Sequence, residues 1–243
     1  MQYGRLNLNS QNKLSASIFV KEKTYEKKFK KIVELCLYAH SIMREKEKNI
    51  DGEQEETLRS ILKHYMETNR GLFKLGNYHF DAESAEINEN YTTEGYCDIK
   101  VTIPTNNIWS CKAEKYFTLE CKRLDGTSAK NNKYIEDGMH RFITEKYSKN
   151  MNIGGMIGFI ETNKNKKEPI DIDNIVTNIN TILITKHNHL PEEKLNVVSI
   201  DTNHYSCESV HAITNNNRKI QLVHLFLDNR PGPKRKFNRR IFV

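Results

Sequence analysis

The sequence contains few cysteines, and no two of them have C-x-x-C spacing. The five are Cys36, Cys97, Cys111, Cys121 and Cys207, scattered over 243 residues. Several of them fall in segments that we predict to be core strands. This usage argues against a cysteine zinc framework. We therefore expect reduced thiols and a cytoplasmic protein.

Long apolar runs are also missing. No stretch approaches the length of apolar residues that spans a bilayer, so no membrane association is expected. The first residues, MQYGRLNLNSQNKL, lack the apolar segment of a signal peptide. The glycines between Ile153 and Ile160 do not form a G-x-G-x-x-G turn that opens a helix, which argues against nucleotide binding there.

The composition that remains fits one polar α/β domain. Hydrophobic residues make up 37%, which is enough for a single core. A mean hydropathy of −0.72 requires a very polar surface. The net charge of +7 suits a polyanionic partner without establishing one. Residues 231–240, PGPKRKFNRR, form a basic tail that either contacts phosphates or is a disordered solubilising segment.

Between Glu94 and Arg123 the sequence predicts two strands joined by a polar connection. Apolar and polar residues alternate in each, which is the period of a strand with one buried face. The polar faces carry Asp98 on the first strand and Glu120 and Lys122 on the second. Two carboxylates and an ammonium at a buried sheet are unfavourable unless something binds, and Mg²⁺ would suit them. The alternative is a solvated face with a weak ion pair.

The remaining pattern predicts alternating helices and strands. Helices are expected at Thr24–Lys48, from Glu53–Thr57 onward, at Asn132–Lys149 and at Ile170–Thr185. Further strands are expected at Tyr78–Ile87, Ile153–Ile160, Val197–Ile200, Ser209–Thr214 and Ile220–Leu227. The prediction is an α/β fold with a central mixed β-sheet flanked by helices, a helical N-terminal extension and a C-terminal β-hairpin. We place boundaries at residues 1–50 for the extension, 51–230 for the main domain and 231–243 for the tail.

Two smaller features need an explanation from the fold. Gly138 lies inside a predicted helix, where glycine costs about 1 kcal/mol relative to alanine, so a close neighbour or a ligand is expected there. The C-terminal hairpin would place His211 and His224 diagonally on one face. A histidine pair can bind metal, but no third ligand is evident. We favour a structural or DNA-facing pair.

Asp98 followed by Glu120-Cys121-Lys122 resembles the active-site signature of the PD-(D/E)XK, or restriction-endonuclease-like, nuclease superfamily. Cys97 stands where the family name has proline. The run from Tyr134 to Phe142 looks like the helix that follows the Glu-x-Lys strand in a bacterial restriction-type branch. The residues Ser209, His211, His224, Phe226 and Asp228 also recur there. The resemblance covers roughly Glu53 to Asp228.

This resemblance implies a set of catalytic residues. Asp98 and Glu120 would hold Mg²⁺, with Mn²⁺ as a substitute, and the carbonyl of Cys121 would add a ligand. Lys122 would orient or activate the attacking water. The family often brings one more acidic residue from a preceding helix, and Glu55 is the candidate, with Glu56 as the alternate. The helix dipole alone would also favour an acidic first turn.

The resemblance further implies a Mg²⁺-dependent DNA endonuclease of bacterial antiviral defence, working beside an ATPase or sensor protein. Homodimers are frequent in that family. Two alternatives stay open: a non-catalytic nucleic-acid-binding or assembly module, and an RNA-directed nuclease. His140 is a DNA-contact candidate whose alternative is a structural role. The other DNA-contact candidates are Tyr134, Arg123, Lys234, Arg235 and Lys236.

Overall fold

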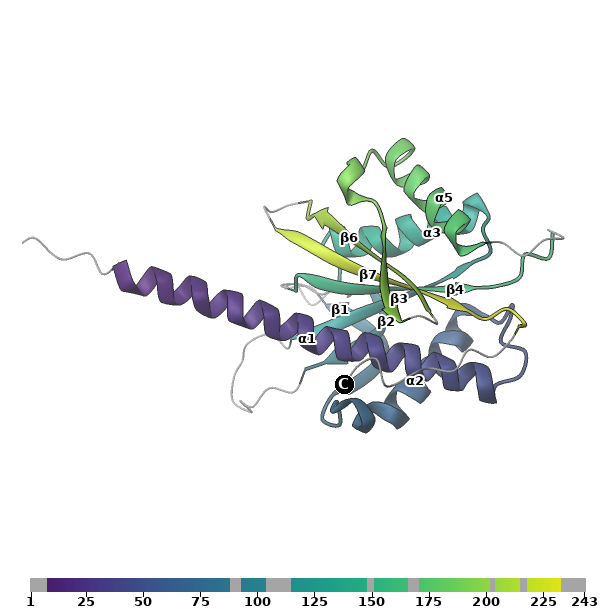
Figure 1. The fold of residues 1–243 in the computed structure, drawn as a ribbon, viewed down its shortest axis with the longest axis horizontal. Helices are drawn as coiled ribbons and strands as arrows, with labels where there is room; N and C mark the ends of the chain where they lie inside the picture. The colour runs from purple at the N-terminus through teal and green to yellow at the C-terminus, as the bar shows by residue number, and fades with distance from the viewer. Residues whose placement is uncertain are drawn as a thin grey trace, which may run out of the picture.

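A computed structural model describes residues 8–87, 93–103, 115–147, 151–165, 171–201, 204–214 and 218–232. Over these residues the chain forms three layers, with one twisted sheet between two layers of helices (Figure 1). The predicted α/β class, with a mixed sheet flanked by helices, is confirmed.

In the described part of the chain, seven strands form one sheet in the order β1-β2-β3-β4-β7-β6-β5. The central strands β3, β4 and β7 are parallel, and all other neighbouring pairs are antiparallel. The bounds are β1 His79–Ile87, β2 Thr93–Thr102, β3 Tyr116–Leu124, β4 Ile153–Ile160, β5 Asn196–Asp201, β6 His204–Ala212 and β7 Lys219–Asp228. β6 begins earlier than the predicted Ser209, because residues 205–208 pair with β7 as well.

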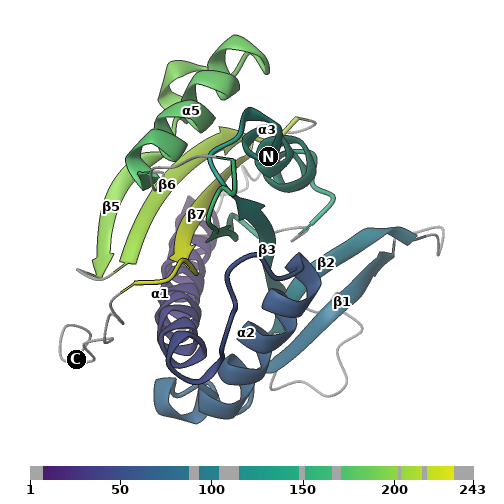
Figure 2. The same ribbon diagram turned by 90° about the vertical axis from the view of Figure 1, so that its right-hand side faces the viewer.

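The helices cover both faces of the sheet (Figure 2). α1 (Leu8–Lys46) and α2 (Glu55–Asn69) lie on one face, and a short 3₁₀ turn, η1 (Arg70–Phe73), follows α2. On the other face lie α3 (Ser128–Tyr134), a π-helical turn η2 (Ile135–Met139), α4 (His140–Ile143) and α5 (Ile172–Thr185). The 3₁₀ turn η3 (Pro191–Glu193) precedes β5. Among the described helices, none has both the length and the apolar character that crossing a lipid bilayer requires.

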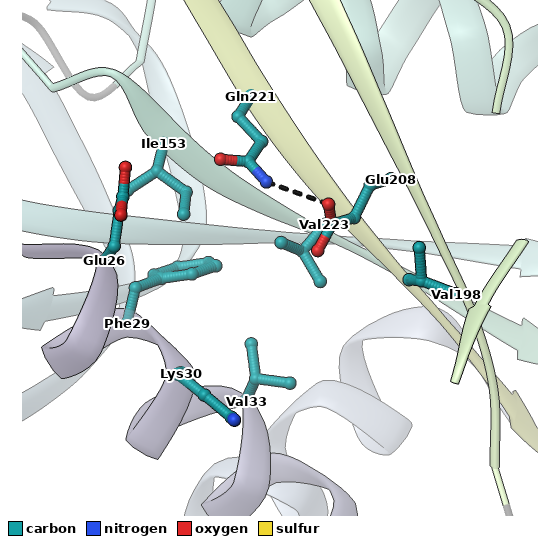
Figure 3. A pocket seen from close by; sticks show the side chains of 9 residues that line it. All are labelled: Glu26, Phe29, Lys30, Val33, Ile153, Val198, Glu208, Gln221 and Val223. Atoms are coloured by element: carbon teal, nitrogen blue, oxygen red, sulfur yellow. Dashed lines mark hydrogen bonds between the residues drawn. The ribbon is translucent and has the colours of Figure 1, made fainter. Parts of the chain in front are cut away.

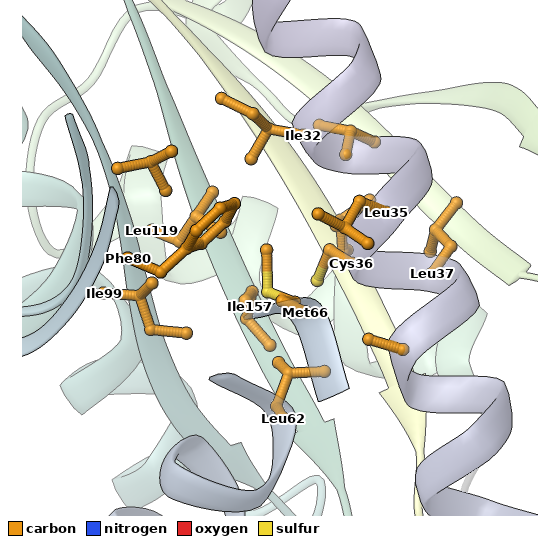
Figure 4. Packing of buried hydrophobic residues seen from close by; sticks show 14 of the residues in the cluster. Ile32, Leu35, Cys36, Leu37, Leu62, Met66, Phe80, Ile99, Leu119 and Ile157 are labelled. Carbon is orange, nitrogen blue, oxygen red and sulfur yellow. The ribbon is translucent and has the colours of Figure 1, made fainter. Parts of the chain in front are cut away.

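α1 is longer than the sequence predicts and is more closely joined to the core. The helix begins at Leu8 rather than Thr24. Residues 8–23 show little apolar periodicity, but no proline or glycine stands between Gly4 and Gly52 to break a helix. Its second half packs on the sheet through fully buried residues such as Ile32 and Leu35 (Figure 4). This half therefore belongs to the same core as the main domain.

The helix that follows β3 differs from the predicted Asn132–Lys149. It begins at Ser128, where the Thr127 side chain accepts a hydrogen bond from the Lys130 amide at 3.4 Å, and α4 ends at Ile143. The π-helical turn in its middle contains Gly138, where an added Cβ would lie 2.5 Å from the Met156 side chain on β4. The end of the Met156 side chain would have to move to admit a larger residue here, so the predicted close neighbour is present.

A buried polar contact ties α1 to the segment after β7. His40 is 2% exposed, and its Nε2 lies 2.9 Å from Oδ1 of Asn229. Burial lowers the pKa of His40 to about 3. The folded protein therefore cannot take up the proton that this imidazole binds in the unfolded chain at mildly acidic pH.

This contact predicts an acid-sensitive fold. Because the folded pKa lies below the ordinary value, stability is kept above pH 6.5 and is lost as the pH falls toward 3, with a slope of up to about 1.4 kcal/mol per pH unit for one proton. His40→Gln should flatten the fall in unfolding free energy between pH 7 and pH 4.5, measured by urea titration. His64→Gln, at an exposed position on α2, is the control. Equal slopes in all three proteins would contradict the assignment.

Candidate active site

β2, β3 and α2 bring together all four predicted catalytic residues. β2 and β3 pair antiparallel with Ile99 opposite Leu119, so Asp98 and Glu120 are on neighbouring strands at the same level. Glu55, the first residue of α2, joins them by contacting Lys122 on β3. We call Glu55, Asp98, Glu120 and Lys122 the carboxylate–lysine cluster.

The Lys122 ammonium lies at the centre of this cluster. Its Nζ is 2.7 Å from the carbonyl oxygen of Cys121 and 2.9 Å from Oε1 of Glu120. Oε1 of Glu55 lies at 3.2 Å, and Oδ2 of Asp98 lies at 3.8 Å. Oxygen atoms from three carboxylates and one backbone carbonyl therefore surround one positive charge.

Glu120 is the most deeply buried member, with no exposed surface. The alternative of a solvated outer face is therefore wrong. Its Oε1 also accepts a hydrogen bond from Arg141 at 3.2 Å, whereas Oε2 has no hydrogen-bond partner among the described residues. Burial raises the pKa of Glu120 to about 8, although Lys122 acts to lower it. Such a carboxylate favours a nearby cation.

The charge of Lys122 is maintained by the same carboxylates. Burial alone would lower the pKa of this amine, but the negative charges of Glu120, Asp98 and Glu55 outweigh burial and raise it. Lys122 is therefore an ammonium, which donates hydrogen bonds and cannot accept a proton.

Asp98 is held by donors on both of its oxygens. The backbone amide of Cys121 donates to Oδ2 at 2.7 Å, and Arg59 of α2 donates to Oδ1 at 2.6 Å. Cys121 thus presents its amide and carbonyl to the cluster while its thiol side chain is buried in the core on the other face. Arg59 is 7% exposed and also pairs with Glu83.

Glu55, rather than its alternate Glu56, makes the contacts. Its second oxygen, Oε2, accepts a hydrogen bond from the amide of Arg123 at 3.0 Å, while Glu56 is exposed. The helix dipole does not explain this placement, because both carboxylate oxygens are bonded to β3.

Sequence reasoning missed three residues that complete the surroundings. Arg59 holds Asp98, Arg141 holds Glu120, and Tyr147 contacts both Arg141 and the carbonyl of Tyr96. A signal for Arg59 existed, because it lies four residues after Glu55 and so on the same face of α2. No comparable signal marks Arg141, whose direction depends on the π-helical turn before it.

The DNA-contact candidates do not gather at the cluster. Tyr134 is fully buried, with its hydroxyl 2.9 Å from Nδ1 of His224, and it presents no surface to a ligand. Arg123 contacts the cluster through its amide, but its guanidinium donates to Glu161 at 2.7 Å. His140 lies 3.3 Å from His189 and not against the carboxylates. Lys234, Arg235 and Lys236 lie outside the described residues.

His211 and His224 share one face as predicted, but they are not diagonal neighbours, because His211 lies opposite Ile220 and His224 lies opposite Cys207. Ser209 stands between them, with its Oγ 2.8 Å from Nε2 of each ring. Both histidines are fully buried, so a DNA-facing pair is wrong. The two rings are buried because the layer that contains α3, η2, α4 and α5 covers the face of the sheet on which they lie.

A pocket of about 320 Å³ lies elsewhere, between α1 and strands β4 to β7 (Figure 3). Its lining includes Phe29, Lys30 and Glu208, and no residue of the carboxylate–lysine cluster takes part. Chemistry at the cluster is therefore separate from this pocket.

No family model, no curated protein and no solved structure matched the chain. The resemblance to PD-(D/E)XK nucleases therefore stays a prediction from the sequence.

The residues of the cluster suit a hard divalent cation. Carboxylate and carbonyl oxygens are the ligands that Mg²⁺ takes in proteins. The buried Oε2 of Glu120 has no described hydrogen-bond partner, and the remaining oxygens already surround a cation, the ammonium of Lys122.

The buried pair of Arg59 and Asp98 predicts a large loss of stability when it is broken. Arg59→Met should reduce the free energy of unfolding by about 3–5 kcal/mol, because Asp98 would lose the donor on one buried oxygen. Lys63→Met on the same helix breaks the surface pair with Glu67 and should cost less than about 1 kcal/mol. Urea midpoints compare the two, and equal losses would contradict the role of Arg59.

Proposed function

We propose that this protein is a Mg²⁺-dependent nuclease that hydrolyses phosphodiester bonds in DNA. Its active-site residues would be Glu55, Asp98, Glu120 and Lys122. The observation that carries the proposal is the position of the Lys122 ammonium among oxygen atoms of Glu55, Glu120 and the Cys121 carbonyl. The predicted Asp…Glu-x-Lys signature supports the same chemistry.

Asp98, Glu120 and the carbonyl of Cys121 are the groups that would hold Mg²⁺, or Mn²⁺ in its place. The metal would supply Lewis-acid polarisation of a phosphoryl oxygen. The Lys122 ammonium already donates to Oε1 of Glu120 and to the Cys121 carbonyl, whereas Oε2 of Glu120 has no hydrogen-bond partner among the described residues. The donors from Arg59 and the Cys121 amide hold Asp98 in place.

The charges of the site favour an anionic substrate. Four acidic side chains, on Glu55, Glu83, Asp98 and Glu120, face three basic ones, on Arg59, Lys122 and Arg141. With all of these groups ionised, the acidic groups exceed the basic ones by one. A divalent cation would leave an excess of one positive charge, which one phosphodiester would offset.

The Lys122 ammonium is suited to stabilising negative charge on a substrate. As an ammonium it offers three N–H donors that can orient a water nucleophile and stabilise negative charge on the phosphate oxygens. Arg141 stays on Glu120 and limits the positions that this carboxylate can take.

The wider setting belongs to the same proposal. Among the described residues, four cysteine side chains are buried, those of Cys36, Cys97, Cys121 and Cys207, which suits a reducing, cytoplasmic compartment. The net charge of +7 suits a nucleic acid. Antiviral defence, an ATPase or sensor partner and a homodimer rest on the sequence resemblance alone.

The proposal predicts metal-dependent cleavage that is lost in active-site variants. Purified protein should nick or linearise supercoiled plasmid with Mg²⁺ or Mn²⁺ and not with EDTA. Glu120→Gln and Lys122→Met should each lower the rate by at least about 100-fold, which is the scale for losing one preorganised charge-stabilising group. Glu67→Gln, on the exposed side of α2, should cleave like the wild type.

Two further measurements separate the alternatives. RNA of the same sequence, assayed in parallel, distinguishes an RNA-directed nuclease. Calorimetric titration with Mn²⁺ tests metal binding without activity, and Glu120→Gln should weaken it. Full cleavage by folded Glu120→Gln and Lys122→Met proteins would contradict the site, and DNA binding without metal binding would favour a non-catalytic module.

A further inference from the structure

A second group of possible metal ligands lies on the other side of α4. His189 follows α5, Glu193 ends η3, and His211 lies on β6. One ligand atom from each lies within 4.8 Å of the other two. Together with His140 we call these residues the histidine cluster. None of its members belongs to the carboxylate–lysine cluster.

The carboxylate of Glu193 stands between two imidazole nitrogens of the same kind. Its Oε2 lies 2.8 Å from Nδ1 of His189, and its Oε1 lies 3.9 Å from Nδ1 of His211. Two imidazoles and one carboxylate form a ligand set that holds zinc in metalloenzymes. Imidazole nitrogen suits Zn²⁺ and similar transition metals, whereas Mg²⁺ prefers oxygen.

The second nitrogen of each ring already has a partner. Nε2 of His211 lies 2.8 Å from Oγ of Ser209, and Nε2 of His189 lies 3.3 Å from Nε2 of His140. Metal-binding histidines almost always use their second nitrogen in this way, which fixes the ring and leaves the first nitrogen for the metal. Ser209 is in turn bonded to buried His224.

The nitrogen left over on His211 is the decisive observation. His211 is fully buried, and its Nδ1 has no hydrogen-bond partner among the described residues. A buried polar atom without a partner costs about 1–3 kcal/mol. This atom faces Glu193 at a distance too long for a hydrogen bond, so a metal ion between them would satisfy it.

The carboxylate is also held in place from behind. The amide of Leu190 donates to Oε2 at 3.1 Å, and the amide of Ala212 donates to Oε1 at 3.1 Å. Ligating carboxylates are commonly fixed by such hydrogen bonds. The side chains of His189 and Glu193 are 11% and 12% exposed, which leaves an open side for an ion to enter.

We propose that His189, Glu193 and His211 bind a divalent transition-metal ion of the Zn²⁺ type, at a site distinct from the carboxylate–lysine cluster. This inference does not depend on the nuclease proposal. The ion would join the segment after α5 to β6, and His140 would link it to α4. Because Arg141, the next residue, holds Glu120, the bound ion would also steady one wall of the candidate active site.

Calorimetric titration of chelator-treated, dialysed full-length protein with Zn²⁺ in excess Mg²⁺ tests this site. The wild type should bind one tight equivalent. Glu193→Gln and His189→Asn, both partly exposed, should each weaken binding by more than the roughly 10–100-fold that loss of an outer-shell partner costs. The loss of Zn²⁺ affinity in Ser209→Ala should lie within that roughly 10–100-fold range. Glu192→Gln, the exposed neighbour, is the matched control and should bind like the wild type.

Glu120→Gln separates this site from the other one. It should keep the tight Zn²⁺ equivalent, whatever becomes of plasmid cleavage. Circular dichroism confirms the fold of each variant before titration. The inference is overturned if the wild type binds no Zn²⁺ tightly, if Glu193→Gln and His189→Asn keep wild-type affinity, or if Glu120→Gln removes the tight site.

Discussion

The burial of Glu120 is the constraint on which the rest of the candidate active site depends. A carboxylate with no exposed surface must be matched by positive charge, and here Lys122 and Arg141 supply it. Lys122 is in turn kept charged by Asp98 and Glu55. Each group is stable in the interior only because the others are present. The cluster therefore behaves as a unit, and its members are not expected to contribute additively.

The alternation of β3 allows such a unit to exist beside a hydrophobic core. Glu120 contacts Arg141 of α4, and the Lys122 side chain passes Gly138 of η2, while Leu119 and Cys121 belong to the core on the face that α1 and α2 cover. The backbone of Cys121 still reaches the charged side through its amide and carbonyl. One strand thus supplies two side chains and two backbone groups to the site, and a register shift of one residue would remove all of them.

Much of this arrangement could be predicted because it depends on local periodicity. Strand alternation placed Asp98, Glu120 and Lys122 on the polar faces of their strands. Glu55 was chosen from the family resemblance, which implies an acidic residue on the preceding helix. The start of α1 was wrong, because helix propensity without apolar periodicity gives a weak signal there. The sequence could not predict that Glu193 lies next to His211, because no sequence period relates a turn after α5 to a residue on β6. Contacts of that kind are set by tertiary packing alone.

The π-helical turn at Ile135–Met139 changes the direction in which the side chains after it point. A π turn holds more residues than an α turn, and one residue corresponds to about 100° of rotation around the axis. His140 and Arg141 follow directly, and they point to the histidine cluster and to Glu120 respectively. Regular α-helical winding through Gly138 would turn both side chains away from these partners. The π-helical turn thus sets the directions of two adjacent side chains, so that His140 contacts His189 and Arg141 contacts Glu120.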